Sequence, residues 1–406
     1  MDAGNKAAFQ PYQADVLFLL IGTNPLPNYV AACLLATDKA TIYLLHTPGQ
    51  KGTGEVAGRL KTRLEQCLPG SSIILREIDE VDGKKIEAKL CKIITGPLPV
   101  TSAVGLNYSG GTKPMAVHVY HALRQAFPDG CYSYLDARSL KMVIRQKDAP
   151  TQMLLVGRTV ELGLVELVTM HGYRLETPRD MPRVSELCKA IAQVHLFKDG
   201  FTQWRDWLNT FGDLECDPRL PTVSEFPALV PVVQAFHDIC GGRATEEGVA
   251  KAIGCKNDRL SNCCGFFLSD WLEKYTLGAL LQFAPDLGIK HFGIGIEPKR
   301  PGQRKFEIDV AAMYGYQLFA ISCIVTEYAE KAKEHLLEIF VRARQLGGDE
   351  ARLGLVCLVK DTVSLQREIE QTWDAEGKLR VFGARHLAHL DRYMQNWFET
   401  ANKEGQ

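Results

Sequence analysis

Residues 1–150 alternate between short apolar runs typical of strands and longer runs with helical periodicity, and this order is the strongest constraint on the fold. Strands that alternate with helices predict a parallel sheet wound on both faces, because each helix must carry the chain back along the sheet before the next strand begins. The runs that make this pattern are 16–21, 29–36, 41–46, 55–67, 73–78, 84–94, 100–106, 116–127, 130–136 and 141–145. The sequence therefore predicts an α/β class for this segment.

The rest of the chain is long enough for further domains, since 406 residues exceed the usual size of a single domain. Residues 151–262 contain helix-like runs separated by breaks rich in Pro and Gly, which predicts a mainly helical connector. This connector is either a winged-helix module or a rigid element that transmits motion between subunits. Residues 263–406 begin with a long amphipathic run at 266–283 and continue with strand-like runs, so we expect a second α/β domain there.

A polar turn with two consecutive glycines follows the apolar run that ends at Leu106. It reads Asn107-Tyr108-Ser109-Gly110-Gly111-Thr112-Lys113-Pro114-Met115 and leads directly into a helix-like run. Glycines permit close approach of the backbone, and free N–H groups at a helix start attract anions. Ser109 and Thr112 add hydroxyl groups and Lys113 adds a cation, which predicts a phosphate-binding turn at the end of a strand. The residue order excludes a Walker A loop, and the alternative is a tight turn with a surface lysine.

A second polar turn ends the apolar run at 16–21 and reads Gly22-Thr23-Asn24-Pro25. A helix-like run follows it, so the local order of strand, turn and helix is the same. Because the carboxyl ends of parallel strands meet at one edge of a sheet, we expect the two turns to face the same crevice. Taken alone, this turn is explained equally well by its ordinary turn residues.

Together, the two turns resemble those of the CARF domain, the Rossmann-like sensor of cyclic oligoadenylates in type III CRISPR defence. The resemblance covers roughly the first third of the chain, and it implies a cyclic oligoadenylate as the activating ligand. A ring of four adenylates has a two-fold axis, which implies a homodimer that places the same turn from each subunit around the ring. The resemblance favours cyclic tetra-adenylate and leaves the ring size open. By this resemblance the ligand pocket is lined by Gly22, Thr23, Asn24, Asn107, Ser109, Gly110, Gly111, Thr112 and Lys113.

The third segment carries a pattern of carboxylates, with Glu307-Ile308-Asp309-Val310 in a strand-like run and Glu273 in the amphipathic run before it. This arrangement resembles the PD-(D/E)xK nuclease fold, especially the nuclease half of CARF nucleases. The resemblance implies that Asp309, Glu273 and Glu307 are catalytic and that Asp309 and Glu273 hold a Mg²⁺ or Mn²⁺ ion. Such an ion would lower the pKa of bound water for attack on DNA or RNA.

The sequence departs from this nuclease motif where the family has Glu-x-Lys, because Ser322-Cys323-Ile324 stands there. One hypothesis is that the lysine has migrated to Lys305, Lys331 or Lys333, with Glu327 supplying a carboxylate. The other hypothesis is a degenerate nuclease fold kept for binding or dimerisation. The basic loop at Lys299, Arg300, Arg304 and Lys305 either holds phosphates or forms an exposed turn.

Three functions are therefore considered for the chain. The first is an effector in which a cyclic oligoadenylate controls a metal-dependent nuclease, and the second is a catalytically inactive CARF sensor with a pseudo-nuclease domain. In the third, the CARF domain itself cleaves the ring. A net charge of -1 excludes a strongly basic nucleic-acid coat for all three.

The twelve cysteines include no Cys-x-x-Cys pair, so the sequence does not predict a zinc ribbon. Several of them lie in apolar runs, and we expect these to be small buried hydrophobic residues. The first 13 residues are polar, and no apolar run approaches the roughly 20 residues of a membrane span. We therefore expect no membrane segment and a cytoplasmic protein, and the resemblance to a type III CRISPR sensor implies a prokaryotic one.

Overall fold

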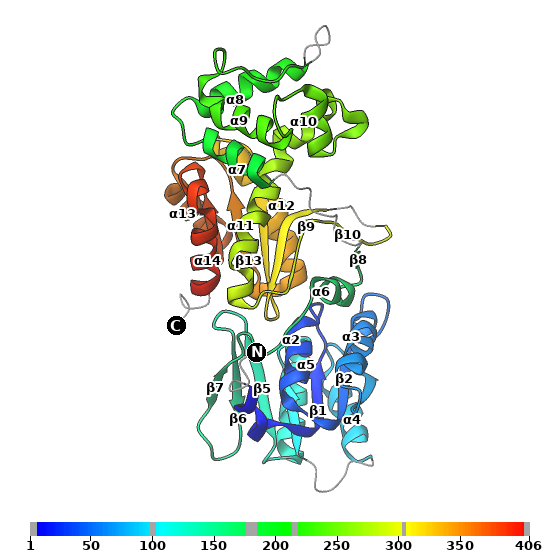
Figure 1. Cartoon of the computed structure of the whole chain (residues 1–406). Helices are drawn as coiled ribbons and strands as arrows, with labels where there is room; N and C mark the ends of the chain where they lie inside the picture. The colour runs from blue at the N-terminus through cyan, green and yellow to red at the C-terminus, as the bar shows by residue number, and fades with distance from the viewer. Residues whose placement is uncertain (1–5, 97–102, 176–184, 213–217, 303–305, 402–406) are drawn as a thin grey trace.

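The computed structural model describes residues 6–96, 103–175, 185–212, 218–302 and 306–401. Its elements are arranged in three stacked regions (Figure 1). A large sheet with its helices forms the lower region, a smaller sheet with four helices forms the middle region, and a group of helices forms the upper region.

The first sheet has seven strands in the order β3-β2-β1-β4-β5-β6-β7. Strands β1 to β5 are parallel, which confirms the predicted parallel α/β sheet. The last two strands are antiparallel, because a short hairpin joins β5 to β6 and another joins β6 to β7. The strands are β1 (Ala14–Leu20), β2 (Ala36–His46), β3 (Ser72–Glu77), β4 (Val104–Asn107), β5 (Cys131–Asp136), β6 (Lys141–Arg145) and β7 (Gln152–Leu155).

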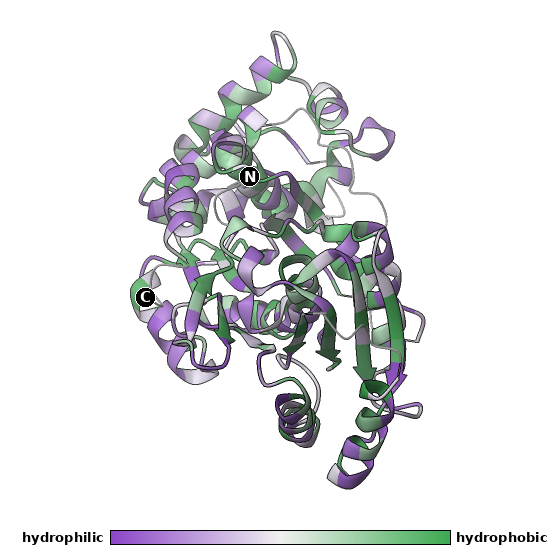
Figure 2. Ribbon diagram, turned by 90° about the horizontal axis from the view of Figure 1, so that it is seen from below, coloured by the Kyte–Doolittle hydropathy of each residue, from purple (hydrophilic) through white to green (hydrophobic). Residues whose placement is uncertain are grey.

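Helices cover both faces of this sheet, which explains why β1 is apolar along nearly its whole length. Leu17 and Leu19 belong to the core beneath α2 (Leu26–Leu35) and α3 (Gly54–Cys67). The alternate residues, such as Phe18, belong to a second core beneath α4 (Gly83–Ile94) and α5 (Lys113–Ala126). Seen from below, the strands are green and hydrophobic, whereas the outer helices alternate between green and purple (Figure 2).

The second sheet has five strands in the order β14-β13-β12-β11-β9. Strands β9 (His291–Ile296), β11 (Ile308–Tyr314) and β12 (Gln317–Cys323) are antiparallel, and β13 (Arg352–Val356) and β14 (Leu379–Phe382) continue in parallel from β12. Its helices are α11 (Trp271–Leu287), α12 (Ala329–Gly347), α13 (Thr362–Trp373) and α14 (Leu390–Thr400). Helices α12 and α13 share the core of one face, and α11 and α14 share the core of the other face. The predicted second α/β unit is therefore present.

The middle of the chain contributes to more than one region. Strand β7 and helix α6 (Leu164–Met170) lie past residue 150 but belong to the lower region, where α6 packs against α3. A two-residue strand, β8 (Arg174–Leu175), pairs with β10 (Pro298–Lys299). The described residues from 185 to 262 form helices and turns without a strand, namely α7 (Ser185–Val194), α8 (Gly200–Asn209), α9 (Val230–Ile239), α10 (Glu246–Ile253) and short helical turns. These helices share one hydrophobic core with α11.

The two sheets are joined by a continuous hydrophobic core. It includes Leu19 and Tyr29 of the first sheet region, Leu167 of α6, and Ile308 and Leu353 of the second sheet. The hairpin between β11 and β12 touches the segment after β7, where Leu162 N donates a hydrogen bond to Gly315 O at 3.2 Å. The lower and middle regions therefore pack against each other directly.

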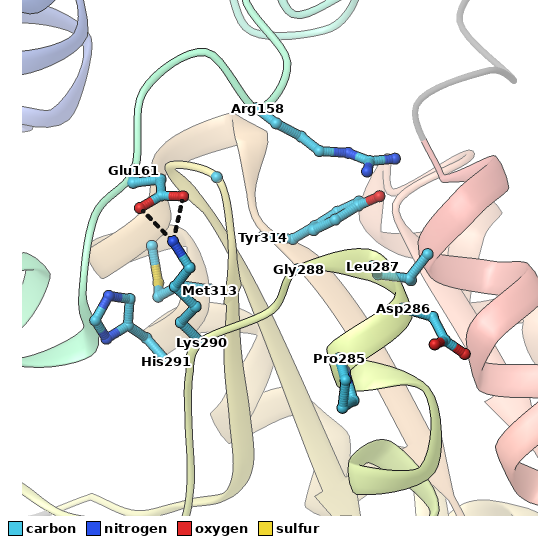
Figure 3. Close-up of a pocket in the computed structure, with 11 residues that line it drawn as sticks. Arg158, Glu161, Pro285, Asp286, Leu287, Gly288, Lys290, His291, Met313 and Tyr314 are labelled. Atoms are coloured by element: carbon cyan, nitrogen blue, oxygen red, sulfur yellow. Dashed lines mark hydrogen bonds and ion pairs between the residues drawn. The ribbon is translucent and has the colours of Figure 1, made fainter. Parts of the chain in front are cut away.

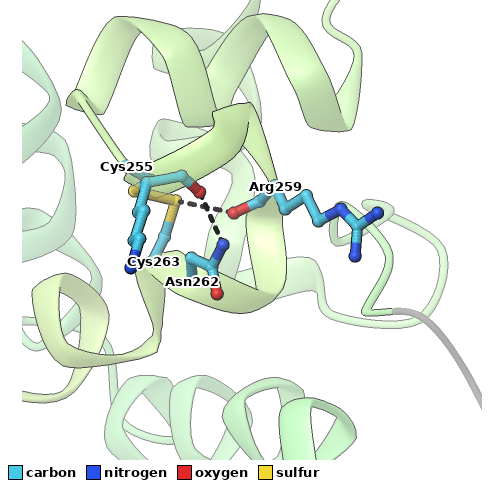
Figure 4. The surroundings of a disulfide bond; sticks show 5 residues. Cys255, Arg259, Asn262 and Cys263 are labelled. Carbon is cyan, nitrogen blue, oxygen red and sulfur yellow. Dashed lines mark hydrogen bonds between the residues drawn. A yellow bond between two sulfur atoms is a disulfide. The ribbon is translucent and has the colours of Figure 1, made fainter.

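Two cysteines have a role that the sequence did not reveal. Cys255 and Cys263 form a disulfide that closes a short loop after α10 (Figure 4). Within the loop, Asn262 Nδ2 donates a hydrogen bond to Lys256 O at 2.5 Å. Other cysteines, such as Cys188 and Cys323, are buried as expected.

In the described part of the chain, every helix is too short or too polar to cross a membrane.

Candidate functional site

The two polar turns lie side by side at the carboxyl ends of β1 and β4, which are neighbouring parallel strands. A side-chain carbon at Gly22 would lie 3.2 Å from Gly111 N, and one at Gly110 would lie 2.3 Å from Leu20 O. Gly111 has a φ of +77°, a conformation that glycine adopts without strain. The two turns can approach each other only because these positions are glycines. This close approach explains why both turns lie together at one edge of the sheet, as we expect from the sequence.

Two of the predicted ligand residues stabilise the second turn from within. Asn107 is fully buried, where its Nδ2 donates to Ser133 Oγ at 3.1 Å and its Oδ1 accepts from Ser109 N at 3.2 Å. Ser109 Oγ accepts a hydrogen bond from Leu135 N at 2.7 Å. These contacts fix the shape of the turn, so both side chains have a structural role in addition to the predicted ligand role.

Thr112 and Lys113 begin helix α5. Thr112 Oγ1 accepts from Met115 N at 3.3 Å, as an N-cap does, and donates to Glu80 O at 2.7 Å. Lys113 is exposed at the first helical position. The start of α5 thus combines an exposed cation with the backbone N–H groups of a helix N-terminus, a combination that attracts anions.

In the first turn, Thr23 is exposed and Asn24 Oδ1 accepts from Leu26 N at 2.9 Å. Asn28, a residue that the sequence did not single out, is fully buried beside the glycines and its Nδ2 donates to Leu20 O at 2.9 Å. Its Oδ1 has no hydrogen-bond partner among the described residues, and a side-chain carbon at Gly110 would lie 3.1 Å from it. A buried amide oxygen of this kind is an unsatisfied acceptor behind the glycines of the two turns.

Asn24 also connects this turn to the second sheet. Gly348, in the turn between α12 and β13, has a φ of +66°. A side-chain carbon there would lie 2.4 Å from Asn24 Nδ2 and 2.5 Å from Glu350 Oε2. Glu350 is 2% exposed, and burial raises the pKa of its carboxyl to about 7. This contact joins residues more than three hundred positions apart, and no local pattern in the sequence indicates it.

The carboxylates predicted in the third segment come together at the start of β11. Asp309 is buried, and its Oδ2 accepts from Cys323 N at 2.6 Å and from Ser322 Oγ at 3.3 Å. Glu273 lies in the first turn of α11, where burial, followed by the charges of Asp309, Asp270 and Glu307, raises its pKa to about 8. Burial also raises the pKa of Asp309, against the effect of the Cys323 N–H. Glu307 is exposed just before β11.

The chemistry of these carboxyl groups suits a divalent cation that is completed by substrate. Burial holds both groups toward the protonated form, and the charges of Asp309, Asp270 and Glu307 add to this effect for Glu273, so a cation would favour ionisation of both. Mg²⁺ commonly rests on one or two carboxylates together with substrate phosphates. Within the described residues, no three His, Cys, Asp or Glu side chains are grouped so that they could hold a metal ion. Asp309 and Glu273 therefore fit a shared site and do not form a closed protein cage.

Two of the lysines that the sequence offers as replacements for the missing motif lysine contact side chains other than Asp309. Lys333 forms ion pairs with Glu330 at 2.7 Å and Glu368 at 2.6 Å. Lys331 lies over the ring of Tyr328, with its Nζ 5.6 Å from the ring centroid. These contacts hold both lysines away from the role of the motif lysine beside Asp309.

Other candidates from the sequence also point away from the carboxylates. Glu327 pairs with Lys360 at 3.4 Å, and Arg300 lies 3.9 Å from Glu55 of the lower region. Lys299 is in β10. Arg304 and Lys305 lie outside the described residues.

One histidine near the carboxylates was missed by sequence reasoning. His335 lies on α12 and is exposed, and its Nδ1 is 2.7 Å from Ser322 Oγ. Ser322 is fully buried and stands opposite Asp309 on the neighbouring strand. A lone histidine on an amphipathic helix gives no signal in sequence, because only the packing of α12 on β12 brings it to this site.

A separate pocket of about 370 Å³ lies where the β11–β12 hairpin meets the end of α11 and the segment after β7 (Figure 3). Lys290 Nζ donates to the Glu161 carboxylate at 3.0 Å, and the Arg158 guanidinium lies 4.2 Å from the centroid of the Tyr314 ring. None of the residues predicted for the ligand or nuclease sites lines this pocket. Lys290 is thus paired and Arg158 is stacked at the junction between the two sheets.

No protein-family model matches this chain, and no curated protein matches it. Two solved structures match it over nearly its whole length. Can2 from Sulfobacillus thermosulfidooxidans, solved in complex with cyclic tetra-adenylate, is 18% identical with a TM-score of 0.66 over 97% of this chain and 98% of that chain. Protein VC1899 from Vibrio cholerae is 16% identical with a TM-score of 0.68 over 95% and 98%. The chain therefore shares its overall fold with these two proteins.

Proposed function

We propose that this chain is a type III CRISPR accessory protein that binds a cyclic oligoadenylate and controls a nuclease-like domain. The observation that carries the proposal is the joined pair of turns at the start of α5, in a chain whose fold follows Can2 from end to end. The solved Can2 structure contains cyclic tetra-adenylate, so this ring is the first ligand to test. The proposed setting is the prokaryotic cytoplasm, where this second messenger is made and read.

The ligand chemistry follows from the residues at the crevice. Lys113 and the first N–H groups of α5 favour phosphate, and the glycines let the backbone approach a ligand closely. Thr23 is exposed in the first turn, where its hydroxyl group can form a hydrogen bond with a ligand. Together, these groups are suited to binding an anionic nucleotide.

A second copy of the chain is proposed to complete this site. Helix α2, which follows the first turn, is buried along nearly its whole length, whereas α5, which follows the second turn, leaves side chains exposed to a partner. On that side Tyr108 and Tyr134 pack together, and Val143 and Met153 continue the same row across β6 and β7. Val117 of α5 is 64% exposed and Met153 is 56% exposed. We call Tyr108, Val117, Tyr134, Val143 and Met153 the outer face.

The outer face is the proposed site of contact between two copies. An open antiparallel sheet face is normally polar, whereas this one presents aromatic and aliphatic side chains to solvent. It begins at Tyr108, within the ligand turn itself. Two copies joined here would bring two Lys113 side chains around one two-fold ring, and the anionic ring would offset their mutual repulsion.

For the second region, the proposed function is metal-dependent cleavage of DNA or RNA. Asp309 and Glu273 would hold Mg²⁺ or Mn²⁺, which when bound supplies charge stabilisation at the scissile phosphate and a more acidic water. Asp309 is oriented for this role by the Cys323 N–H and the Ser322 hydroxyl. Exposed Glu307 stands at the same end of β11, where substrate has access.

The second candidate function is a sensor without nuclease chemistry. Ser322 and Ile324 at the motif positions favour it, as do the engaged positions of Lys331 and Lys333. In this case the second sheet serves as a binding or dimerisation platform.

One experiment separates these functions. Binding of cyclic tetra-adenylate is measured by calorimetry for the wild type, Lys113→Met and the control Lys92→Met, which changes an exposed lysine on α4. We expect Lys113→Met to weaken binding by roughly 1.5–3 kcal/mol, because a charge-assisted contact is lost, and Lys92→Met to bind as the wild type does. No binding of any ring of three, four or six adenylates by the wild type would overturn the sensor proposal.

Cleavage of plasmid and single-stranded RNA is then measured on the same samples, with ring and Mn²⁺ added separately and together. We expect cleavage only with both additions, and none from Asp309→Asn with its ligand affinity retained. Ring binding without cleavage would establish the inactive sensor instead. Chromatography of the ring after incubation tests the third hypothesis, since linear adenylates would appear if the CARF-like region cuts the ring.

A further inference from the structure

The buried hydroxyl of Ser322 connects a carboxylate on one strand to an imidazole on a neighbouring helix. Its Oγ lies 3.3 Å from Asp309 Oδ2 and 2.7 Å from His335 Nδ1. The three groups come from β11, β12 and α12, so the arrangement depends on the packing of the sheet and is not a local turn. Ser322 is fully buried, whereas His335 is exposed.

The donors and acceptors in this chain of contacts determine the tautomer of the histidine. A hydroxyl has one proton to donate, and an ionised carboxylate only accepts hydrogen bonds. When Asp309 is ionised, as a bound cation would keep it, Ser322 donates to Asp309 and its oxygen is left to accept from His335, which places the proton of the neutral ring on Nδ1. The lone pair on Nε2 is then directed away from Ser322 on an exposed side chain.

We propose that His335 is the general base of this nuclease-like site and that Ser322 is the residue that positions it. The inference rests on the proposed nuclease function. In the step, His335 Nε2 takes a proton from a water molecule while the water oxygen bonds to the phosphorus of the substrate. The bond from phosphorus to the leaving sugar oxygen breaks, and that oxygen takes a proton from solvent. A positioned base of this kind typically contributes 10²–10⁴-fold to rate.

This arrangement explains the departure from the family motif in chemical terms. The two motif positions that lost a carboxylate and a lysine are Ser322 and Ile324. Serine at the first position is short enough to leave room for a side chain from α12, and its hydroxyl bonds to the imidazole that enters. The base is then supplied by a helix and no longer by the strand.

The test uses the full-length chain with cyclic tetra-adenylate and Mn²⁺ and compares His335→Ala, His335→Gln and Ser322→Ala. The control is His389→Ala, which removes another exposed histidine. We expect both His335 variants to cleave roughly 100-fold or more slowly, with ring affinity and Mn²⁺ affinity unchanged. Added imidazole should restore part of the rate of His335→Ala and leave the other variants as they are, because a free base can occupy only the vacated space.

A second readout does not depend on activity. The ¹³Cδ2 chemical shift of His335 in the protein with Mg²⁺ added, without substrate, should report the Nδ1–H tautomer in the wild type, and Ser322→Ala should lose this preference. Cleavage by His335→Gln within twofold of the wild type, or a loss in His335→Ala that imidazole does not restore, would overturn the proposal. Absence of cleavage by the wild type would instead overturn the nuclease function on which it rests.

Discussion

Glu350 is a buried carboxyl group placed where the two sheets meet. Its backbone oxygen accepts hydrogen bonds from Gln317 Nε2 at 2.7 Å and from Arg352 Nη1 at 2.8 Å, which hold the strand end in place. Its side chain lies beside Gly348, next to the ligand turn. Because burial opposes ionisation, the protonation of this one residue is linked to the stability of the junction.

This linkage predicts how stability depends on pH. The pKa of Glu350 is raised from 4.5 to about 7, so the folded chain holds this proton over a range in which the unfolded chain has lost it. The contribution is fully present below pH 4.5, falls as pH rises, and is lost above pH 7, by roughly 3 kcal/mol in total. Urea unfolding at pH 5 and pH 8 should show a smaller pH difference for Glu350→Gln than for the wild type. The exposed control Glu338→Gln should keep the wild-type difference, and equal differences in all three proteins would contradict the assignment.

At the scale of elements, the turn between α12 and β13 brings the second sheet region into contact with the first polar turn. Gly348 holds φ +66° and ψ −158°, a region that is essentially limited to glycine. Asn24 and Glu350 fill the space where a side chain would project. If the first turn moves on ligand binding, we therefore expect it to displace the end of α12, the helix that carries His335.

Gly348→Ala should disturb this contact in a way that an ordinary glycine substitution does not. The new methyl group would collide with Asn24 Nδ2, and the backbone would add strain of roughly 1–3 kcal/mol. We expect a lower melting temperature together with weaker binding of cyclic tetra-adenylate. The control is Gly288→Ala at the end of α11, where φ is +68° and no atom lies within 4 Å of the added carbon. That variant should lose some stability but keep the ligand affinity, and equal affinities for both variants would show that the turn is not coupled to the ligand site.

At the scale of the whole molecule, the lower and middle regions form a continuous core, whereas the outer face leaves apolar side chains uncovered. The proposed ligand turn adjoins the outer face, since Tyr108 lies within that turn and Val117 lies on α5, the helix that the turn begins. Assembly and ligand binding are therefore expected to be linked, because a ligand that bridges two copies stabilises their association.

Val117→Arg tests this assembly by placing a charge in the centre of the outer face. We expect the wild type to sediment as a dimer, more tightly with cyclic tetra-adenylate present, and Val117→Arg to sediment as a monomer with weaker ligand binding. Val363→Arg on α13 is the matched control, since Val363 is also exposed, at 56%, but lies far along the chain in the other sheet region. A wild-type monomer with ligand bound, or a dimer that persists in Val117→Arg, would refute the proposed contact.

The sequence by itself predicted the alternation of strands and helices in the two sheet regions, the two polar turns and the strand that carries Asp309, but not β7 or α8. These features are local, because strand and helix periodicity, turn residues and a strand carboxylate are each encoded within a few neighbouring positions. The departure at Ser322 and Ile324 was also visible from the sequence alone.

Only the tertiary structure decided what surrounds these residues. The Ser322–His335 pair, the contact of Gly348 with Asn24, the Cys255–Cys263 disulfide and the antiparallel strands β6 and β7 emerge when separate elements pack together. Asn107 likewise appears in sequence as a polar turn residue, yet packing buries it against Ser133. Such contacts depend on the distance between elements in space, which the periodicity of each element does not encode.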